Sequence, residues 1–194
     1  MTVAAIVLAG GASSRFGGDK LAAPLGDRPV LAHVVGVARL VAEQVVVVIG
    51  PDDPVPPLAG IEIARDTIAR EGPLAGLVAG LRALDVADAA LILAGDMPRV
   101  REGVLVLLLE ALAADPALGA VYLESDPLHP LPLAVRPVIA LPTAVRLLGL
   151  DRRSLRALVD AVASVPVPAI RWRALDPEGE TLRDIDTPAD LEAS

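Results

Sequence analysis

The chain has 194 residues, 54% of them hydrophobic, and its 25 Asp and Glu outnumber its 17 Lys and Arg to give a formal net charge of −8. This composition excludes intrinsic disorder and suffices for the core of one domain spanning residues 1–194. The acidic balance and the presence of only one Phe, one Tyr and one Trp argue against nucleic acid as a partner, because such proteins need a basic field and stacking platforms.

The lack of cysteine narrows the chemistry further. It excludes disulfides, thiolate nucleophiles and cysteine-bound zinc, so that a metal should be a hard cation held by carboxylates. No apolar run approaches the roughly 18 residues that cross a bilayer, so we expect no membrane association and a cytoplasmic protein.

Short β-branched segments alternate with longer helical patterns, which is typical of a mainly parallel sheet with helices on both faces. The expected strands are 3–9, 45–49, 61–64, 89–94, 120–123 and 131–135. The expected helices are 30–41, 74–84, 104–113, 140–148 and 152–163. Strands such as VVVVI and LILA are apolar throughout and should be covered on both faces. With right-handed crossovers, these elements predict an α/β fold with three αβα layers, similar to the Rossmann fold.

Three further segments complete the chain. Residues 51–60, PDDPVPPLAG, are too rich in proline for a helix or a central strand and should form a connecting loop. Residues 165–172, VPVPAIRW, should be extended, and DTPADLEA at 186–193 should begin a final helix.

Ligands of open α/β sheets bind beyond the carboxyl ends of the strands, so the loops that follow strands are the candidate sites. The first, LAGGASSRFGGDK at 8–20, has Gly10 and Gly11 where the backbone can approach a ligand, and Arg15 and Lys20 as cations. This combination predicts a phosphate-binding loop. It is not a P-loop, because Lys20 is followed by Leu21 rather than Ser or Thr.

The second loop, ARDTIAREGPLAGL at 64–77, leads into a helix. Pro73 suits the first helical turn, and Gly72 allows a base or sugar to lie against the backbone, with Leu74 next in the chain. Asp66 follows a predicted strand, where it would bind a ribose hydroxyl or cap a turn.

The third loop, AGDMP at 94–98, places a carboxylate directly after a buried strand. Gly95 and Pro98 make a sharp turn there, and Asp96 should point into the crevice at the edge of the sheet. With no Cys or His nearby, a hard divalent ion is its natural partner, and a turn or helix cap is the alternative.

The fourth candidate, RDIDTPADL at 183–191, combines a helix start with two carboxylates. Thr187 and Pro188 fit an N-cap and a first helical position. Asp184 and Asp186 alternate about one apolar residue and should lie on the same side of an extended segment, either against a ligand or in solvent. His129, which stands between two prolines, is either a structural or a ligand-binding residue.

In this order, LAGGASSRFGGDK, GPLAGL, AGDMP and DIDTPADL resemble the motifs of the molybdenum cofactor guanylyltransferases and of their wider nucleotidyltransferase clan. The resemblance implies transfer of GMP from GTP to molybdopterin, with Mg²⁺ as cofactor and pyrophosphate as product. It implies that Leu8, Ala9, Gly10, Gly11 and Lys20 hold the nucleotide and its phosphates. Asp66 would lie at the nucleotide, Asp96 would bind the metal, and Arg15 with Lys20 would offset charge on the pyrophosphate. His129 and Pro130 match the family's HP element.

The chain departs from the family at one point. The family carries asparagines around the final TP motif, whereas this chain has Asp184 and Asp186. A carboxylate accepts hydrogen bonds but cannot donate them, so the pterin acceptor is the open question. The alternatives are a cytidylyltransferase acting on the same pterin, another small-molecule nucleotidyltransferase of the clan, or a nucleotide-binding regulator without turnover.

Overall fold

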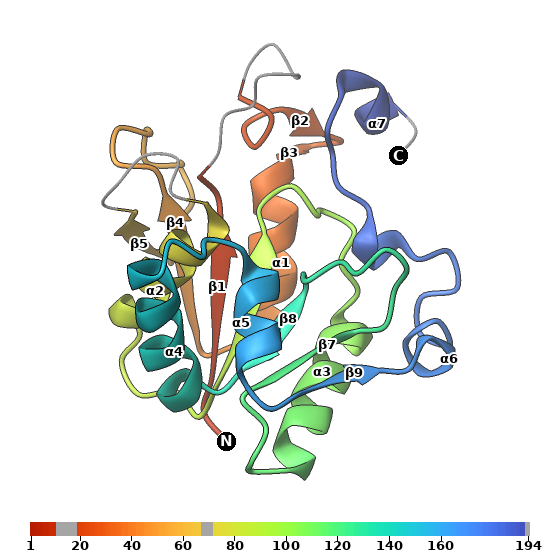
Figure 1. The fold of residues 1–194 in the computed structure, drawn as a ribbon. Coiled ribbons are helices and arrows are strands. Elements are labelled where there is room, and N and C mark those ends of the chain that lie inside the picture. The colour runs from red at the N-terminus through yellow and green to blue at the C-terminus, as the bar shows by residue number, and fades with distance from the viewer. Residues whose placement is uncertain (11–18, 67–71, 193–194) are drawn as a thin grey trace.

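The centre of the molecule is a mixed β-sheet (Figure 1). The structure is a computed structural model, and the residues described from it are 1–10, 19–66 and 72–192. Within these ranges, seven strands lie in the order β5-β4-β1-β6-β8-β7-β9. They are β1 (Val3–Leu8), β4 (Gln44–Ile49), β5 (Glu62–Arg65), β6 (Ala89–Ala94), β7 (Ala120–Leu123), β8 (Leu133–Val135) and β9 (Ser164–Val167). Neighbouring strands are parallel except where β8 pairs with β6 and β7, so the mainly parallel sheet is confirmed.

Helices cover both faces of this sheet, as the three-layer prediction requires. They are α1 (Val30–Val41), α2 (Pro73–Ala83), α3 (Glu102–Ala114), α4 (Pro137–Gly149), α5 (Leu155–Ala161), α6 (Ala169–Trp172), α7 (Pro188–Glu192) and the 3₁₀ turn η1 (Glu180–Leu182). Apolar side chains of α1 and α3 pack on one face, and those of α2, α4 and α5 pack on the other. A short hairpin, β2 (Pro24–Leu25) with β3 (Arg28–Pro29), precedes α1 and was not predicted.

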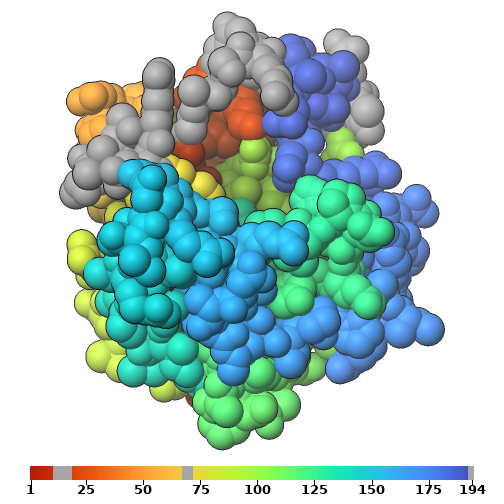
Figure 2. Space-filling model, viewed as in Figure 1, coloured from red at the N-terminus to blue at the C-terminus, as the bar shows by residue number. Residues whose placement is uncertain are grey.

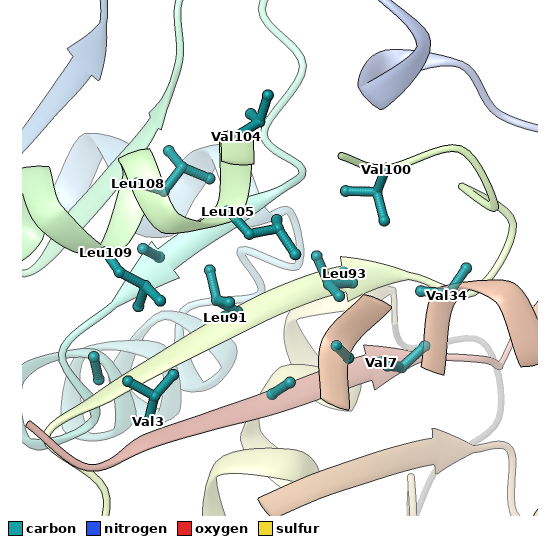
Figure 3. Packing of buried hydrophobic residues seen from close by; sticks show 14 of the residues in the cluster. Val3, Val7, Val34, Leu91, Leu93, Val100, Val104, Leu105, Leu108 and Leu109 are labelled. Carbon is teal, nitrogen blue, oxygen red and sulfur yellow. The ribbon is translucent and has the colours of Figure 1, made fainter. Parts of the chain in front are cut away.

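The core follows from the alternation of side chains along the strands. In β1, Val7 faces the layer of α1 and α3, whereas Ile6 faces the layer of α2, α4 and α5. Figure 3 shows Leu91 and Leu93 of β6 on the side from which α3 contributes Leu105. Burial of each such side chain contributes about 1.5–3 kcal/mol, which explains why the central strands are apolar throughout.

Local signals decide where two helices of the second layer begin. α4 starts at Pro137, three residues before the expected start, because proline is well suited to the first helical position. α5 starts later than expected, at Leu155, because the Oγ of Ser154 accepts a hydrogen bond from the backbone N–H of Ala157 at 3.1 Å.

The prediction that residues 165–172 are extended was wrong for their second half. β9 ends at Val167, and α6 follows directly. Trp172 is completely buried, and its indole N–H donates to the carbonyl oxygen of Glu124 at 3.0 Å. The side chain of Glu124 also accepts from the first N–H of α6, that of Ala169, at 2.7 Å. The VPVP part, residues 165–168, does keep an extended backbone, and these tertiary contacts hold the following AIRW residues in a helical turn.

Residues 51–60 form no helix or strand, as predicted. In the part of the chain described, no helix is both long and apolar enough to cross a membrane.

Candidate active site

The loops that follow β1, β4, β5 and β6 meet at one edge of the sheet. Leu8, at the end of β1, lies opposite Val48 of β4 and Ala94 of β6. Gly10 lies so close to the next loop that a Cβ there would be 3.2 Å from the backbone nitrogen of Gly50. A side chain at position 10 would therefore require this neighbouring backbone to shift by a few tenths of an ångström.

Three segments far apart in the sequence are joined by one ammonium group. Nζ of Lys20 lies 2.5 Å from a carboxylate oxygen of Asp96 and 3.4 Å from one of Asp186. The side chains of Lys20 and Asp96 are each 19% exposed, whereas that of Asp186 is 59% exposed. In Figure 2, the segment that carries Asp186 (dark blue) lies beside the red to orange N-terminal part of the surface. The predicted phosphate-binding loop, the predicted metal ligand and the predicted acceptor segment thus share one site.

The carboxylates of Asp96 and Asp186 stabilise the charged form of Lys20. Burial lowers the pKa of this amine, but the hydrogen bond and negative charge of Asp96, helped by Asp186, outweigh burial, so that the pKa is raised above its ordinary value. Lys20 is also the only lysine in the chain, and the other 16 of its 17 Lys and Arg residues are arginines. A lysine ammonium is a compact charge with three N–H donors, and here it contacts two carboxylates. This singular lysine was a sequence signal for the site that our sequence analysis missed.

Asp184 is the most perturbed carboxyl group of the site. Desolvation and the negative charges of Asp96 and Asp186 raise its pKa to about 6, against the opposing effects of His129 and Lys20. The residue keeps contact with solvent at the surface, so the shift reflects crowding by protein atoms and like charges rather than full burial.

The backbone of residues 184–186 explains why both carboxylates lie on the same side of this segment. Ile185 is 3% exposed and its N–H donates to the carbonyl oxygen of Asp96 at 2.9 Å. With Ile185 turned inward, Asp184 and Asp186 are both on the outer side, as the alternation predicted. The Asp190 carboxylate then accepts from the N–H groups of Asp186 and Thr187, at 3.0 and 2.7 Å, at the start of α7.

The structure brings His129 into the same neighbourhood. An electrostatic interaction links its side chain to Asp184, and its backbone N–H donates to the hydroxyl of Ser125 at 2.9 Å. The segment between β7 and β8 therefore contributes to this side of the site.

The second candidate loop follows β5, two strands from β1, and its members differ in accessibility. Asp66 follows β5 directly, and its N–H donates to the carbonyl oxygen of Ile49 at 2.9 Å. Gly72 has φ 86°, a conformation that favours glycine, and Pro73 is exposed. The side chain of Leu74 is completely buried in the core, so a ligand could meet only its backbone.

The turn before α5 packs against the start of α2, a contact that the sequence did not predict. The carbonyl oxygen of Arg153 accepts from the N–H of Leu74 at 3.2 Å, and a Cβ at Gly72 would be 3.0 Å from that same oxygen. The predicted nucleotide loop is thus held from the α5 side of the molecule.

Arg65 holds the loop after β4, and the sequence analysis did not single out this residue. Its Nη1 donates to the carbonyl oxygens of Gly50, Pro51 and Asp53 at 2.9–3.0 Å. A cavity of about 530 Å³ lies between this loop and the end of β1. Its apolar lining includes Ala9, Leu21, Leu31, Ile49, Pro57 and Leu58. The proline-rich loop therefore forms a wall of a cavity next to the predicted site and is more than a surface connection.

Two predicted site residues, Gly11 and Arg15, lie outside the described residues.

Comparisons with known proteins place this geometry in a family. The sequence model of the MobA-like NTP transferase domain matches residues 5–166. The chain belongs to this family. It is similar to a "probable molybdenum cofactor guanylyltransferase" from Mycobacterium avium, with 34% identity over all of this chain and 95% of the relative. A protein of the same name from Chloroflexus aggregans is 32% identical, with 98% of this chain and 92% of the relative covered.

The fold agrees with that of a solved MobA-like protein. Molybdopterin-guanine dinucleotide biosynthesis protein A from Archaeoglobus fulgidus superposes with a TM-score of 0.81 at 24% identity, over 98% of this chain and 95% of the other. The family match includes Lys20, Asp66 and Asp96 but ends before Asp184 and Asp186. Residues 183–191 are instead covered by the full-length match to the M. avium relative.

Proposed function

We propose that this protein transfers GMP from GTP to molybdopterin, with Mg²⁺ as cofactor and pyrophosphate as product. The contact of Lys20 with both Asp96 and Asp186 is the observation that carries the proposal, because it unites a phosphate-binding loop with a carboxylate and an acceptor segment. The names of the full-length relatives support the choice of GTP and molybdopterin. We also propose a cytoplasmic location, because GTP is made and used there.

The proposed reaction is an in-line displacement at phosphorus. An oxygen of the molybdopterin phosphate attacks the α-phosphorus of GTP, and the bond from that phosphorus to the bridging oxygen breaks as pyrophosphate leaves. A phosphate monoester is already ionised at neutral pH, so no general base is required. The ammonium of Lys20, with Arg15 from the same loop, offsets the charge that develops on the leaving group.

The donor set of the site fits a magnesium ion. Carboxylate oxygens are the ligands that Mg²⁺ prefers, and Mg²⁺ is usually held by one or two carboxylates together with substrate phosphates. Asp96 supplies such a carboxylate, and among the described residues no group of three His, Asp or Glu side chains converges into a protein-only metal site. Asp96 would hold the ion, which would neutralise phosphate charge when bound.

We assign the acceptor side to Asp184, Asp186 and His129. The ring N–H and amino groups of a pterin need hydrogen-bond acceptors, which carboxylates provide as well as amides do. Replacing both aspartates by Asn should preserve activity in part, whereas replacing both by Ala should raise the KM for molybdopterin and leave GTP affinity unchanged. Loss of GTP affinity in the double Ala variant would move this segment to the nucleotide site.

The nucleotide assignment has a direct test. Calorimetry with GTP, CTP, ATP and UTP in the presence of Mg²⁺ should show preference for GTP, since a purine offers more stacking area than a pyrimidine. Pyrophosphate should then be released from GTP only when molybdopterin is added. CTP binding as tight as GTP binding would favour a cytidylyltransferase, and binding without turnover would favour a nucleotide-binding regulator.

A further inference from the structure

A single arginine ties the acceptor segment to the loop that carries Asp96. Arg99 lies three residues after Asp96, between β6 and α3. Its Nη1 donates to the carboxylate of Glu180 at 2.9 Å, and its Nη2 donates to the carbonyl oxygen of Asp190 at 3.4 Å. Glu180 and Asp190 stand on opposite sides of residues 184–186 in the sequence. One guanidinium therefore holds the acceptor segment at both of its ends.

The environment of this pair makes it stronger than a surface ion pair. The side chains of Arg99 and Glu180 are only 20% and 13% exposed. An ion pair that is partly shielded from water is less screened than an exposed one, and its hydrogen bonds are charge-assisted. The fork of the guanidinium also allows two separate N–H groups to hold two separate acceptors, which a lysine cannot do with the same geometry.

Backbone contacts carry this restraint to the carboxylates. Between the two anchor points, the N–H of Ile185 donates to the carbonyl oxygen of Asp96 at 2.9 Å. The backbone N–H of Arg101 donates to the hydroxyl of Thr181, a buried residue next to Glu180, at 3.2 Å. The segment therefore contacts the loop after β6 at several points. On the loop side, the contacts of Asp96 and Arg101 named here come from backbone groups, whereas those of Arg99 come from its side chain and can be removed by substitution.

We propose that Arg99 is a positioning residue that sets Asp184 and Asp186 against Asp96 and Lys20 in the arrangement that acceptor binding requires. The inference rests on the proposed function for the identity of the acceptor. The hydrogen bonds given above join Arg99 to both ends of the acceptor segment. Its loss should therefore weaken acceptor binding and leave nucleotide binding as it is.

The test compares Arg99→Ala with Arg101→Ala as a matched control. Arg101 is on the same loop, but its side chain is 57% exposed and lies 3.9 Å from its partner, Asp176. Arg99→Ala should raise the KM for molybdopterin by about tenfold, the loss expected for one charge-assisted hydrogen-bonded pair, with GTP affinity within about twofold of wild type. Arg101→Ala should change neither value by more than about twofold.

Hydrogen exchange gives a readout that does not depend on the acceptor. The amide of Ile185 should exchange about tenfold faster in Arg99→Ala than in wild type, while amides of β1 keep their rates. Should Arg99→Ala fail to fold, Arg99→Lys replaces it, and it should show a smaller rise in KM and in exchange because it retains the charge opposite Glu180. Unchanged exchange at Ile185, or an equal loss of GTP and acceptor binding, would overturn the positioning role. Faster exchange in an enzyme that does not use molybdopterin would instead uphold the positioning role and refute the proposed function.

Discussion

Removal of the Lys20 charge is the sharpest test of how the site works. At the observed separation of 2.5 Å from Asp96, two unit charges attract by roughly 2–7 kcal/mol for effective dielectric constants between about 80 and 20. Most of this attraction offsets the desolvation of two side chains that are each 19% exposed, so the net gain to folding is small. In the reaction, however, the ammonium would face developing negative charge. Loss of one preorganised charge-stabilising group typically costs about 2.7–4 kcal/mol, or roughly 10²–10³ in rate.

We therefore expect Lys20→Ala to lower kcat/KM by about 10²–10³, and to lower the melting temperature as well because the Asp96 carboxylate loses its counter-ion. The assay is pyrophosphate release at saturating and limiting GTP, with thermal unfolding measured on the same samples. Arg28→Ala is a matched control, because Arg28 is a cation of the same region that is 57% exposed and pairs only loosely, at 3.6 Å, with Asp27. Arg15→Ala should behave like Lys20→Ala if both cations face the phosphates.

Two results would refute this reasoning. A fall of less than about threefold in both Lys20→Ala and Arg15→Ala would mean that the loop does not stabilise charge in the reaction. A large fall accompanied by an equally large fall for Arg28→Ala would mean that the activity depends on the general charge of the region, not on the contact between Lys20 and Asp96.

Three further predictions concern carboxylates. Asp96→Ala should abolish pyrophosphate release with the circular dichroism spectrum unchanged, because the Asp96 side chain is partly exposed and outside the hydrophobic core. Near-normal rates would make it a turn residue. Asp184→Asn should raise the melting temperature of the ligand-free protein at pH 7.5 but not near pH 4. Because the pKa of Asp184 is raised in the folded state, the wild-type protein loses stability as pH rises from about 4 to about 6. An equal gain in melting temperature at both pH values would show that ionisation of Asp184 is not the reason for the gain. Asp176→Ala should lower the free energy of unfolding by about 2–4 kcal/mol, measured by urea denaturation, because this buried carboxylate accepts the N–H groups of Glu180 and Thr181. A loss below about 0.5 kcal/mol would show that water replaces it.

The sequence by itself determined the layers of the fold and the edge at which the site lies. The repeats of apolar residues placed helix α1 at Val30–Val41, where the structure has it, and the uninterrupted apolar strands required cover on both faces. The loops that follow strands were predicted to carry the site, and the strands before Gly10, Asp66 and Asp96 are parallel members of one sheet, so their carboxyl ends lie at the same end of it. These inferences succeed because strand and helix periods, and the chain reversals between them, are written in residues that are close together in the sequence.

Only the tertiary structure decided which side chains meet. Lys20 contacts Asp96 and Asp186, which are 76 and 166 residues away, and Arg99 holds Glu180, which is 81 residues away. The same holds for α6, whose helical turn depends on the burial of Trp172 and on its hydrogen bond to Glu124. Such pairs depend on the course of whole loops and on the rotamers that packing selects, and no short-range pattern encodes either of these.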